Sequence, residues 1–271
     1  MEILVCVKRV PAPGSRINVT QDGLAVDTSN LGFTTSPHEE CAVEEAVRIV
    51  EEHGGSVTVL TLGSALSEEQ LRYAASVGAN KFVLVETDGE HDSDAQQTAE
   101  AIRETVISLE ASHGIFDLIL FGNESADSSG YQVGIRVAVS LDRPMVNGIK
   151  NIDVGDTQIT AHREVDNGYE VYSLKAPAVF GIKEGINLPR YPTMKGRLAS
   201  KKAEISTVSA SASVASQQRV RLHRPEEETV ETTILGNDAT AAVKIADLLE
   251  ELDLIHFLLL ELEINLKKGL K

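Results

Sequence analysis

The sequence lacks the features that mark membrane proteins and nucleic-acid-binding proteins. It contains no run of about 20 apolar residues, so we expect no membrane-spanning helix. Lysine and arginine together number 25 against 41 aspartates and glutamates, which gives a net charge of −16. Because sequence-independent binding of DNA or RNA needs a basic surface, we expect no nucleic-acid partner.

Cysteine is scarce, and tryptophan is absent. The two cysteines, Cys6 and Cys41, are too few for a disulfide framework, which is typical of proteins in a reducing compartment. The first residues, Met1 to Val5, have neither the basic region nor the cleavage site of a signal peptide. We therefore expect a cytoplasmic protein. Its hydrophobic content of 42% is sufficient for a real core.

The loop at 122–134 matches neither the Walker A pattern nor the Gly-x-Gly-x-x-Gly fingerprint. It joins an apolar strand at 118–121 to a helix expected at 135–141. Ser129 and Gln132 have the form of a capping box. Free backbone N–H groups and the positive end of the helix dipole would meet there, which suits a phosphate. Two interpretations stay open, namely a phosphate-binding loop and an ordinary strand-to-helix turn.

Strands and helices alternate over the first 141 residues. This order predicts an α/β fold with a doubly wound, mostly parallel, Rossmann-like sheet and helices on both of its faces. Ser36 with Glu39, and Ser93 with Gln96, form further capping boxes. A hairpin turn is expected at 21–23. The expected strands are 2–7, 56–61, 81–86 and 118–121, and the expected helices start at Ser36, Ser67 and Ser93.

The pattern changes after residue 148. Strands expected at 148–154, 158–165 and 168–174 are separated by glycine-containing turns and form an antiparallel meander, and 178–182 returns to the sheet. We expect an α/β domain at 1–205, a Ser/Ala-rich linker at 206–236, a helical arm at 237–255 and a tail at 256–271. The arm's helix is expected at 237–252, capped by Asn237 or Asp238.

The segment 183–202 combines prolines and glycines, which argue against a regular element, with apolar and basic side chains. An irregular loop with apolar anchors and a basic rim suits docking to a partner, although a loop folded onto its own core is equally compatible. The candidate docking residues are Leu188, Arg190, Tyr191, Met194 and Arg197.

Three stretches resemble the beta subunit of electron transfer flavoprotein (ETF). Val5–Val10 looks like that family's first strand and loop, and Ser36–Ala46 looks like its Asn-Pro-x-x-x-x-Ala-Val-Glu-Glu-Ala helix start. Asn187–Met194, with Lys201 and Lys202 downstream, looks like its Asn-x-Pro-Arg-Tyr signature, which is the specific match. The resemblance extends from Met1 to about Ile255 and leaves 256–271 outside it.

The resemblance implies an electron carrier without catalytic residues of its own. Such a beta subunit forms a heterodimer with an alpha subunit that binds most of the FAD, and it holds a structural AMP. Its helical arm would lie on alpha. The pair would carry electrons from acyl-CoA dehydrogenases, in fatty acid beta-oxidation, and from other dehydrogenases to a membrane ETF–quinone oxidoreductase.

The resemblance also assigns residues to the AMP site. Asp127 and Gln132 match acidic and Gln positions of the family's phosphate loop, and the backbone from Ser128 to Val133 would face the phosphate. Ser36 stands where the family usually has Asn, and Val133 where many AMP-binding members have Thr. If Gly130 takes a positive φ or approaches the phosphate closely, a β-branched residue there should weaken nucleotide retention. The full set of cofactor-binding candidates is Cys6, Ser36, Leu62, Gly122, Asp127, Ser128, Ser129, Gly130, Tyr131, Gln132 and Val133.

Three alternatives stay open. In electron-bifurcating relatives a second FAD replaces AMP. They share the Gln132-Val133-Gly134 triplet but usually carry Asp-Thr where Ala12-Pro13 stands here. A nucleotide-binding stress or signalling module, or a lone enzyme acting on a phosphorylated substrate, would not explain Asn187–Met194. A lone enzyme would also need a base or nucleophile near the loop.

Overall fold

The computed structural model describes residues 1–87, 93–210, 215–225 and 232–254. The chain divides into two units, Met1–Arg224 and Pro225–Lys271. The expected tail at 256–271 lies outside the described residues. None of the described helices combines the length and the apolar character needed to cross a membrane.

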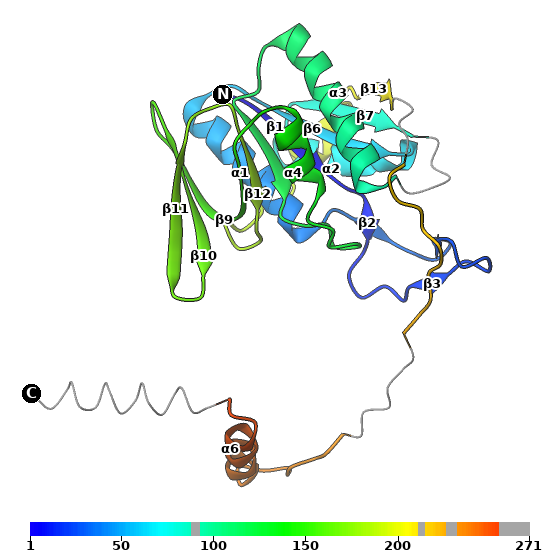
Figure 1. Ribbon diagram of the computed structural model, residues 1–271, viewed down its shortest axis with the longest axis vertical. Coiled ribbons are helices and arrows are strands. Elements are labelled where there is room, and N and C mark those ends of the chain that lie inside the picture. Colours follow the sequence, from blue (N-terminus) through cyan, green and yellow to red (C-terminus); the bar gives the residue numbers. More distant parts are fainter. Residues whose placement is uncertain (88–92, 211–214, 226–231, 255–271) are drawn as a thin grey trace, which may run out of the picture. The chain divides into compact units, whose positions relative to one another are not determined.

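A nine-stranded sheet forms the centre of the first unit as described (Figure 1). The strands from β12 to β13 run parallel, and β9, β10 and β11 form the antiparallel meander beside them. The predicted α/β fold with a mostly parallel sheet is therefore confirmed. The order across the sheet is β11 (Gly168–Leu174), β10 (Ile159–Val165), β9 (Met145–Val154), β12 (Ala178–Ile182), β8 (Leu118–Gly122), β1 (Glu2–Val7), β6 (Ser56–Gly63), β7 (Lys81–Glu86) and β13 (Ser206–Ser209).

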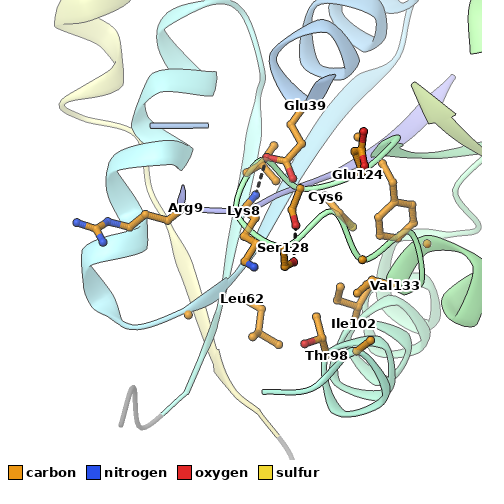
Figure 2. Close-up of a pocket in the computed structure, with 18 of the residues that line it drawn as sticks. Cys6, Lys8, Arg9, Glu39, Leu62, Thr98, Ile102, Glu124, Ser128 and Val133 are labelled. Atoms are coloured by element: carbon orange, nitrogen blue, oxygen red, sulfur yellow. Dashed lines mark hydrogen bonds between the residues drawn. The ribbon is translucent and has the colours of Figure 1, made fainter. Parts of the chain in front are cut away.

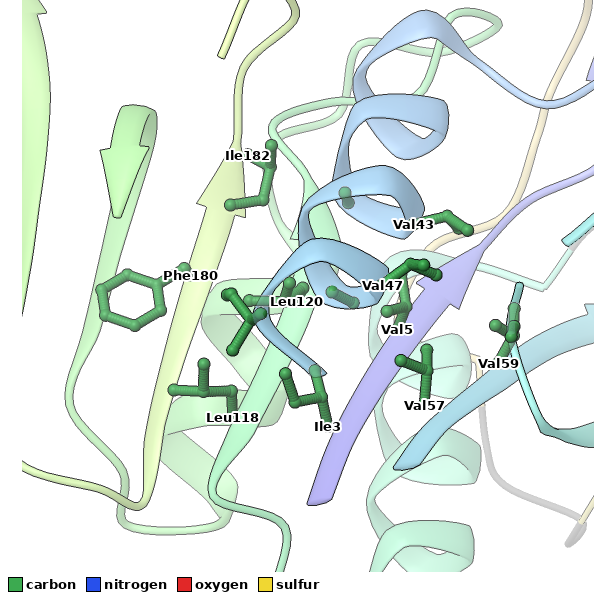
Figure 3. Close-up of a cluster of buried hydrophobic side chains, with 14 of the residues drawn as sticks. Ile3, Val5, Val43, Val47, Val57, Val59, Leu118, Leu120, Phe180 and Ile182 are labelled. Atoms are coloured by element: carbon green, nitrogen blue, oxygen red, sulfur yellow. The ribbon is translucent and has the colours of Figure 1, made fainter. Parts of the chain in front are cut away.

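Successive side chains of a strand point to opposite faces of the sheet. Because the central strands are apolar at successive positions, both faces are apolar, and helices cover both of them. Ile3 and Val5 of β1 pack with α1 (Pro37–His53) and α2 (Glu68–Ser76), as Figure 3 shows for α1. Leu4 and Cys6 pack with α3 (Ala95–His113) and α4 (Val133–Ser140) on the other face. A single 3₁₀ turn, η1 (Ala65–Ser67), precedes α2.

Two small antiparallel pairs lie between β1 and α1 in the sequence. β3 (Asn18–Val19) and β4 (Val26–Asp27) form the hairpin that the turn at 21–23 predicted. β2 (Val10–Pro11) pairs with β5 (Phe33–Thr34). The guanidinium carbon of Arg9 lies 3.4 Å from the centre of the Phe33 ring, so a cation–π contact holds this pair against the first loop.

Two predicted helix starts were wrong. Asp94, not Ser93, caps α3, because its carboxylate accepts from the Gln97 backbone N–H at 2.8 Å and the Gln97 side chain accepts in return. The Ser129–Gln132 capping box does not form, because Ser129 is in the left-handed region and α4 begins at Val133. The Gln132 side chain instead accepts from Arg136, one turn further along.

Three later segments also differ from prediction. The segment 183–202 contains a short helix, α5 (Met194–Ser200), with Thr193 as its cap. Part of the expected linker forms β13, which extends the sheet beside β7 because Thr207 and Val208 suit a pleated edge. In the second unit, α6 (Ala241–Glu251) starts after Thr240 rather than after Asn237 or Asp238, and Asp238 accepts from the Thr240 N–H at 2.9 Å.

Candidate functional site

A cavity of about 490 Å³ lies at the carboxyl ends of β1, β6 and β8 (Figure 2). Ligands of open α/β sheets collect at this edge. One wall is apolar and consists of Cys6, Leu62, Ile102, Phe121 and Val133. Of the predicted cofactor-binding residues, Cys6, Leu62, Gly122, Ser128, Gly130, Tyr131, Gln132 and Val133 line this cavity together.

The loop between β8 and α4 has an unusual backbone. Ser129 and Tyr131 have φ values of 46° and 58°, so the left-handed positions flank Gly130 rather than fall on it. Gly130 itself does not have a positive φ, so the first of the two conditions for its predicted role is not met, and a Cβ added there would have Ser128 Oγ as its nearest neighbour at 3.9 Å. The loop leads directly into α4, whose first N–H groups have no acceptor within the helix.

Asn123 fixes this loop to the sheet. Its backbone N–H donates to the Ile182 carbonyl at 2.8 Å, and its side-chain oxygen accepts from the Gly148 N–H at 2.9 Å. Its side-chain NH₂ donates to the Tyr131 hydroxyl. Asn123 is buried, so this network holds Tyr131 in a backbone conformation that tyrosine rarely adopts.

Charged groups surround the rim of the cavity. The Lys8 ammonium lies 2.6 Å from the Asp127 carboxylate. Partial burial raises the pKa of Asp127, but the Lys8 ammonium outweighs it and holds that pKa below its usual range. Asp127 therefore faces Lys8, and neither Asp127 nor Ser129 is among the cavity-lining residues.

The start of α1 contributes a buried polar corner. Ser36 is fully buried, lies outside the cavity wall, and its hydroxyl has no hydrogen-bond partner among the described residues. Glu39 does line the cavity, and its carboxylate accepts from the backbone N–H groups of Lys8 at 3.0 Å and Ser36 at 3.4 Å. Burial raises the pKa of Glu39 to about 8, although the N–H groups of Lys8 and Ser36 act in the opposite direction.

The candidate docking residues lie on another part of the first unit. Tyr191 is 90% exposed, Leu188 82% and Met194 76%, while Arg197 is also exposed. Arg190 is different, because its guanidinium bridges the Glu44 and Glu51 carboxylates of α1 at 2.8 and 2.7 Å.

The segment that carries these side chains is therefore held firmly at its base. Asn187 donates to the Cys41 carbonyl at 3.0 Å and to Glu45 at 2.8 Å. Arg72 of α2 donates to the Ser200 carbonyl at the end of α5. The apolar tips project outward while the backbone is fixed to α1 and α2.

The chain is similar to known proteins over most of its length. The electron transfer flavoprotein domain matches residues 23–213. The chain belongs to the electron transfer flavoprotein family. It is similar to the electron transfer flavoprotein subunit beta of Mycobacterium leprae, at 37% identity over 76% of this chain and 78% of the relative. The same subunit of Mycobacterium tuberculosis is 35% identical over 76% and 78%. That of Syntrophomonas wolfei is 30% identical over 91% and 95%.

Sequence reasoning missed two residues of this candidate site. Glu39 was interpreted only as part of a capping box, although a glutamate just after a Ser-Pro helix start was visible in the sequence. Asn123 was visible as the residue directly after a buried strand, where ligand-site residues of α/β folds gather. Its contact with Tyr131 across the loop had no signal in the sequence.

We expect Tyr131→Phe to loosen the loop. The change removes the hydroxyl that accepts from Asn123, and a hydrogen bond of this kind contributes about 1 kcal/mol. Amide hydrogen exchange of residues 128–133 should therefore become about fivefold faster, since about 1.4 kcal/mol is a factor of ten. Tyr169→Phe, at an exposed tyrosine of β11, is the matched control. Equal exchange in both variants would show that Asn123 does not hold the loop.

Proposed function

We propose that this chain is the beta subunit of a heterodimeric electron transfer flavoprotein and that its cavity binds AMP. The observation that carries the proposal is the cavity itself, which joins an apolar wall to a strained loop at the N-terminus of α4. The adenine would lie against Cys6, Leu62 and Val133. The phosphate would receive the first N–H groups of α4 and the Ser128 hydroxyl.

The size of the cavity supports a mononucleotide. Small-molecule sites occupy about 300–1,000 Å³, and 490 Å³ lies in the lower part of that range. The nucleotide would be structural, because the chain offers it a scaffold and no reacting group. In this role Asn123 and Glu39 position the ligand, and the apolar wall excludes water from the base.

The redox chemistry belongs to FAD, which we assign mainly to the alpha subunit because this chain carries no dinucleotide fingerprint of its own. The heterodimer would carry electrons from acyl-CoA and other dehydrogenases to a membrane ETF–quinone oxidoreductase, in the cytoplasm. Leu188, Tyr191 and Met194 would dock on the dehydrogenase, and the segment 237–255 would lie on alpha. This chain would be non-catalytic alone.

A second candidate is the electron-bifurcating form, in which FAD replaces AMP in the same cavity. The Gln132-Val133-Gly134 sequence favours it, and all three residues line the cavity. Both candidates use the same loop, so the bound nucleotide distinguishes them.

The test is to express the full chain with its alpha subunit, purify the heterodimer, denature it and quantify the released nucleotides. We expect one AMP and one FAD per heterodimer. Two FAD and no AMP would assign the protein to the bifurcating group, and a heterodimer without any nucleotide beyond one FAD would refute the proposed site.

The flavin itself should depend on alpha. We expect the chain expressed alone to be colourless or nearly so, with the flavin absorbance appearing only after co-expression. A stoichiometric flavin spectrum from the chain alone would contradict the assignment of FAD to alpha.

A further inference from the structure

Glu39 has an open hydrogen-bonding position inside the cavity. Its side chain is only 6% exposed and lies at the end of the cavity nearest β1 and β8. Oε2 accepts the N–H groups of Lys8 and Ser36. Among the described residues Oε1 has no hydrogen-bond partner, and Figure 2 shows the carboxyl reaching toward the cavity beside Lys8 and Cys6.

The Lys8 ammonium attracts the Glu39 carboxyl and the Asp127 carboxylate repels it, but burial outweighs both in setting the pKa of Glu39. The nearby ammonium of Lys8 is already engaged by Asp127 at 2.6 Å, and no ion pair to Glu39 occurs in the part of the chain that the structure describes. Burial without a direct ion pair favours the neutral acid. The ionisable groups near this end of the cavity are Cys6 on β1, Lys8 after it, Glu124 and Asp127 in the loop, and His38 on α1.

The position of the proton follows from the hydrogen bonds. The two backbone donors occupy the lone pairs of Oε2, so the proton of the neutral acid lies on Oε1. This end of the cavity therefore presents the O–H of Glu39 as a donor next to the apolar wall.

We propose that Glu39 is a specificity-determining residue that donates its Oε1 proton to a ring nitrogen of a bound purine nucleotide. This inference rests on the proposed nucleotide function and deepens it. A purine ring carries nitrogen acceptors in its own plane, and the apolar wall would stack against the faces of the ring. When Glu39 loses its proton, a carboxylate faces the lone pair of the ring nitrogen and the nucleotide's own negative charge, so binding weakens.

The test is calorimetric titration of the nucleotide-free full chain with AMP at pH 7, 8 and 9. We expect the affinity of the wild-type chain to fall about tenfold from pH 7 to pH 9. Glu39→Gln should bind AMP with an affinity independent of pH, because its amide oxygen accepts the two N–H groups and its NH₂ donates at every pH. Glu52→Gln, an exposed carboxylate of the same helix, is the control and should follow the wild type.

Analogues of AMP identify the acceptor. Of 1-deaza-, 3-deaza- and 7-deaza-AMP, each of which lacks one ring nitrogen, one should bind about tenfold more weakly than AMP at pH 7. Equal binding of all three, or the same pH response in wild type and Glu39→Gln, would overturn the role of Glu39 while leaving the AMP site intact. Absence of AMP binding in every variant would overturn the proposed function as well.

A ligand-free measurement tests the proton separately. When a buried acid has a raised pKa in the folded state, the protein loses stability, relative to a variant with a neutral amide, as pH rises from the unfolded-state pKa toward the folded-state pKa. The thermal midpoint of Glu39→Gln minus that of the wild type should therefore increase from about pH 5 to about pH 8, and above that pH the difference should stay constant. A constant difference across this interval would show that Glu39 is already ionised, and it would overturn the inference whatever AMP does.

Discussion

Arg190→Ala is expected to lower the free energy of unfolding by about 2 kcal/mol. Glu44 is 3% exposed, and the Arg190 guanidinium contacts its carboxylate at 2.8 Å while also reaching Glu51. Removing one partner of a buried pair costs about 3–5 kcal/mol. The expected loss is smaller because Arg48 still pairs with Glu44 at 2.6 Å and Glu51 is exposed.

Urea denaturation of the full chain measures this loss. Arg197→Ala, at an exposed arginine of the same segment, is the matched control and should change stability little. Arg190→Lys should not restore the wild-type value, because one ammonium cannot bridge two carboxylates as a planar guanidinium does. Equal stability of Arg190→Ala and Arg197→Ala would show that the bridge contributes nothing.

The effect should also depend on pH. Burial raises the pKa of Glu44, but hydrogen bonds from Arg190 and Arg48 outweigh burial and lower it. A carboxyl with a lowered pKa contributes stability above its unfolded pKa and loses that contribution as pH falls. The difference between wild type and Arg190→Ala should therefore shrink below about pH 4.5.

Met194→Ala is expected to weaken docking to a dehydrogenase at least about tenfold, with a matching rise in the apparent KM for the heterodimer. Met194 begins α5, and its side chain is 76% exposed. Burying a side chain of this size on a partner contributes roughly 1.5–3 kcal/mol, and about 1.4 kcal/mol is a factor of ten. A flexible thioether suits a surface that serves several partners.

The measurement is the steady-state rate of a cognate dehydrogenase against the concentration of the heterodimer. Val220→Ala removes a similarly exposed apolar side chain elsewhere in the first unit and serves as control. Met194→Leu should retain most of the affinity because volume is preserved. AMP and FAD contents should stay unchanged in all three variants. An unchanged KM for Met194→Ala, or loss of flavin from it, would instead make the segment structural.

The fold was predictable because hydrophobic periodicity and the order of strands and helices are local signals. The first residues of the helices were less predictable, because two neighbouring residues can each be suitable as the N-cap. Ser93 and Asp94 each have a glutamine three positions later, and the choice is made by tertiary contacts. Asp94 also accepts the backbone N–H groups of Ser216 and Gln217, more than a hundred residues away in the chain.

The candidate site was only partly predictable for the same reason. The loop at 122–134 has a recognisable sequence, and most of its residues do line the cavity. The chemistry of Glu39 depends on the approach of α1 to β8. That approach is so close that a Cβ on Gly122 would lie 2.6 Å from the Glu39 side chain. Neither this approach nor the pairing of Lys8 with Asp127 is encoded in any local pattern.

Helix α1 connects the cavity with the base of the segment that carries the candidate docking residues. Glu39 and Glu44 lie on successive turns of α1, and one turns toward the cavity while the other holds Arg190. A helical turn rises about 5.4 Å, so the base of the docking segment and the cavity wall are parts of the same rigid rod. A force applied to the docking segment would therefore be transmitted through α1 to the central core. If a partner docks on this segment, movement of the proposed complex around that partner would occur at positions outside α1, and a nucleotide in the cavity would keep its position relative to the docking segment.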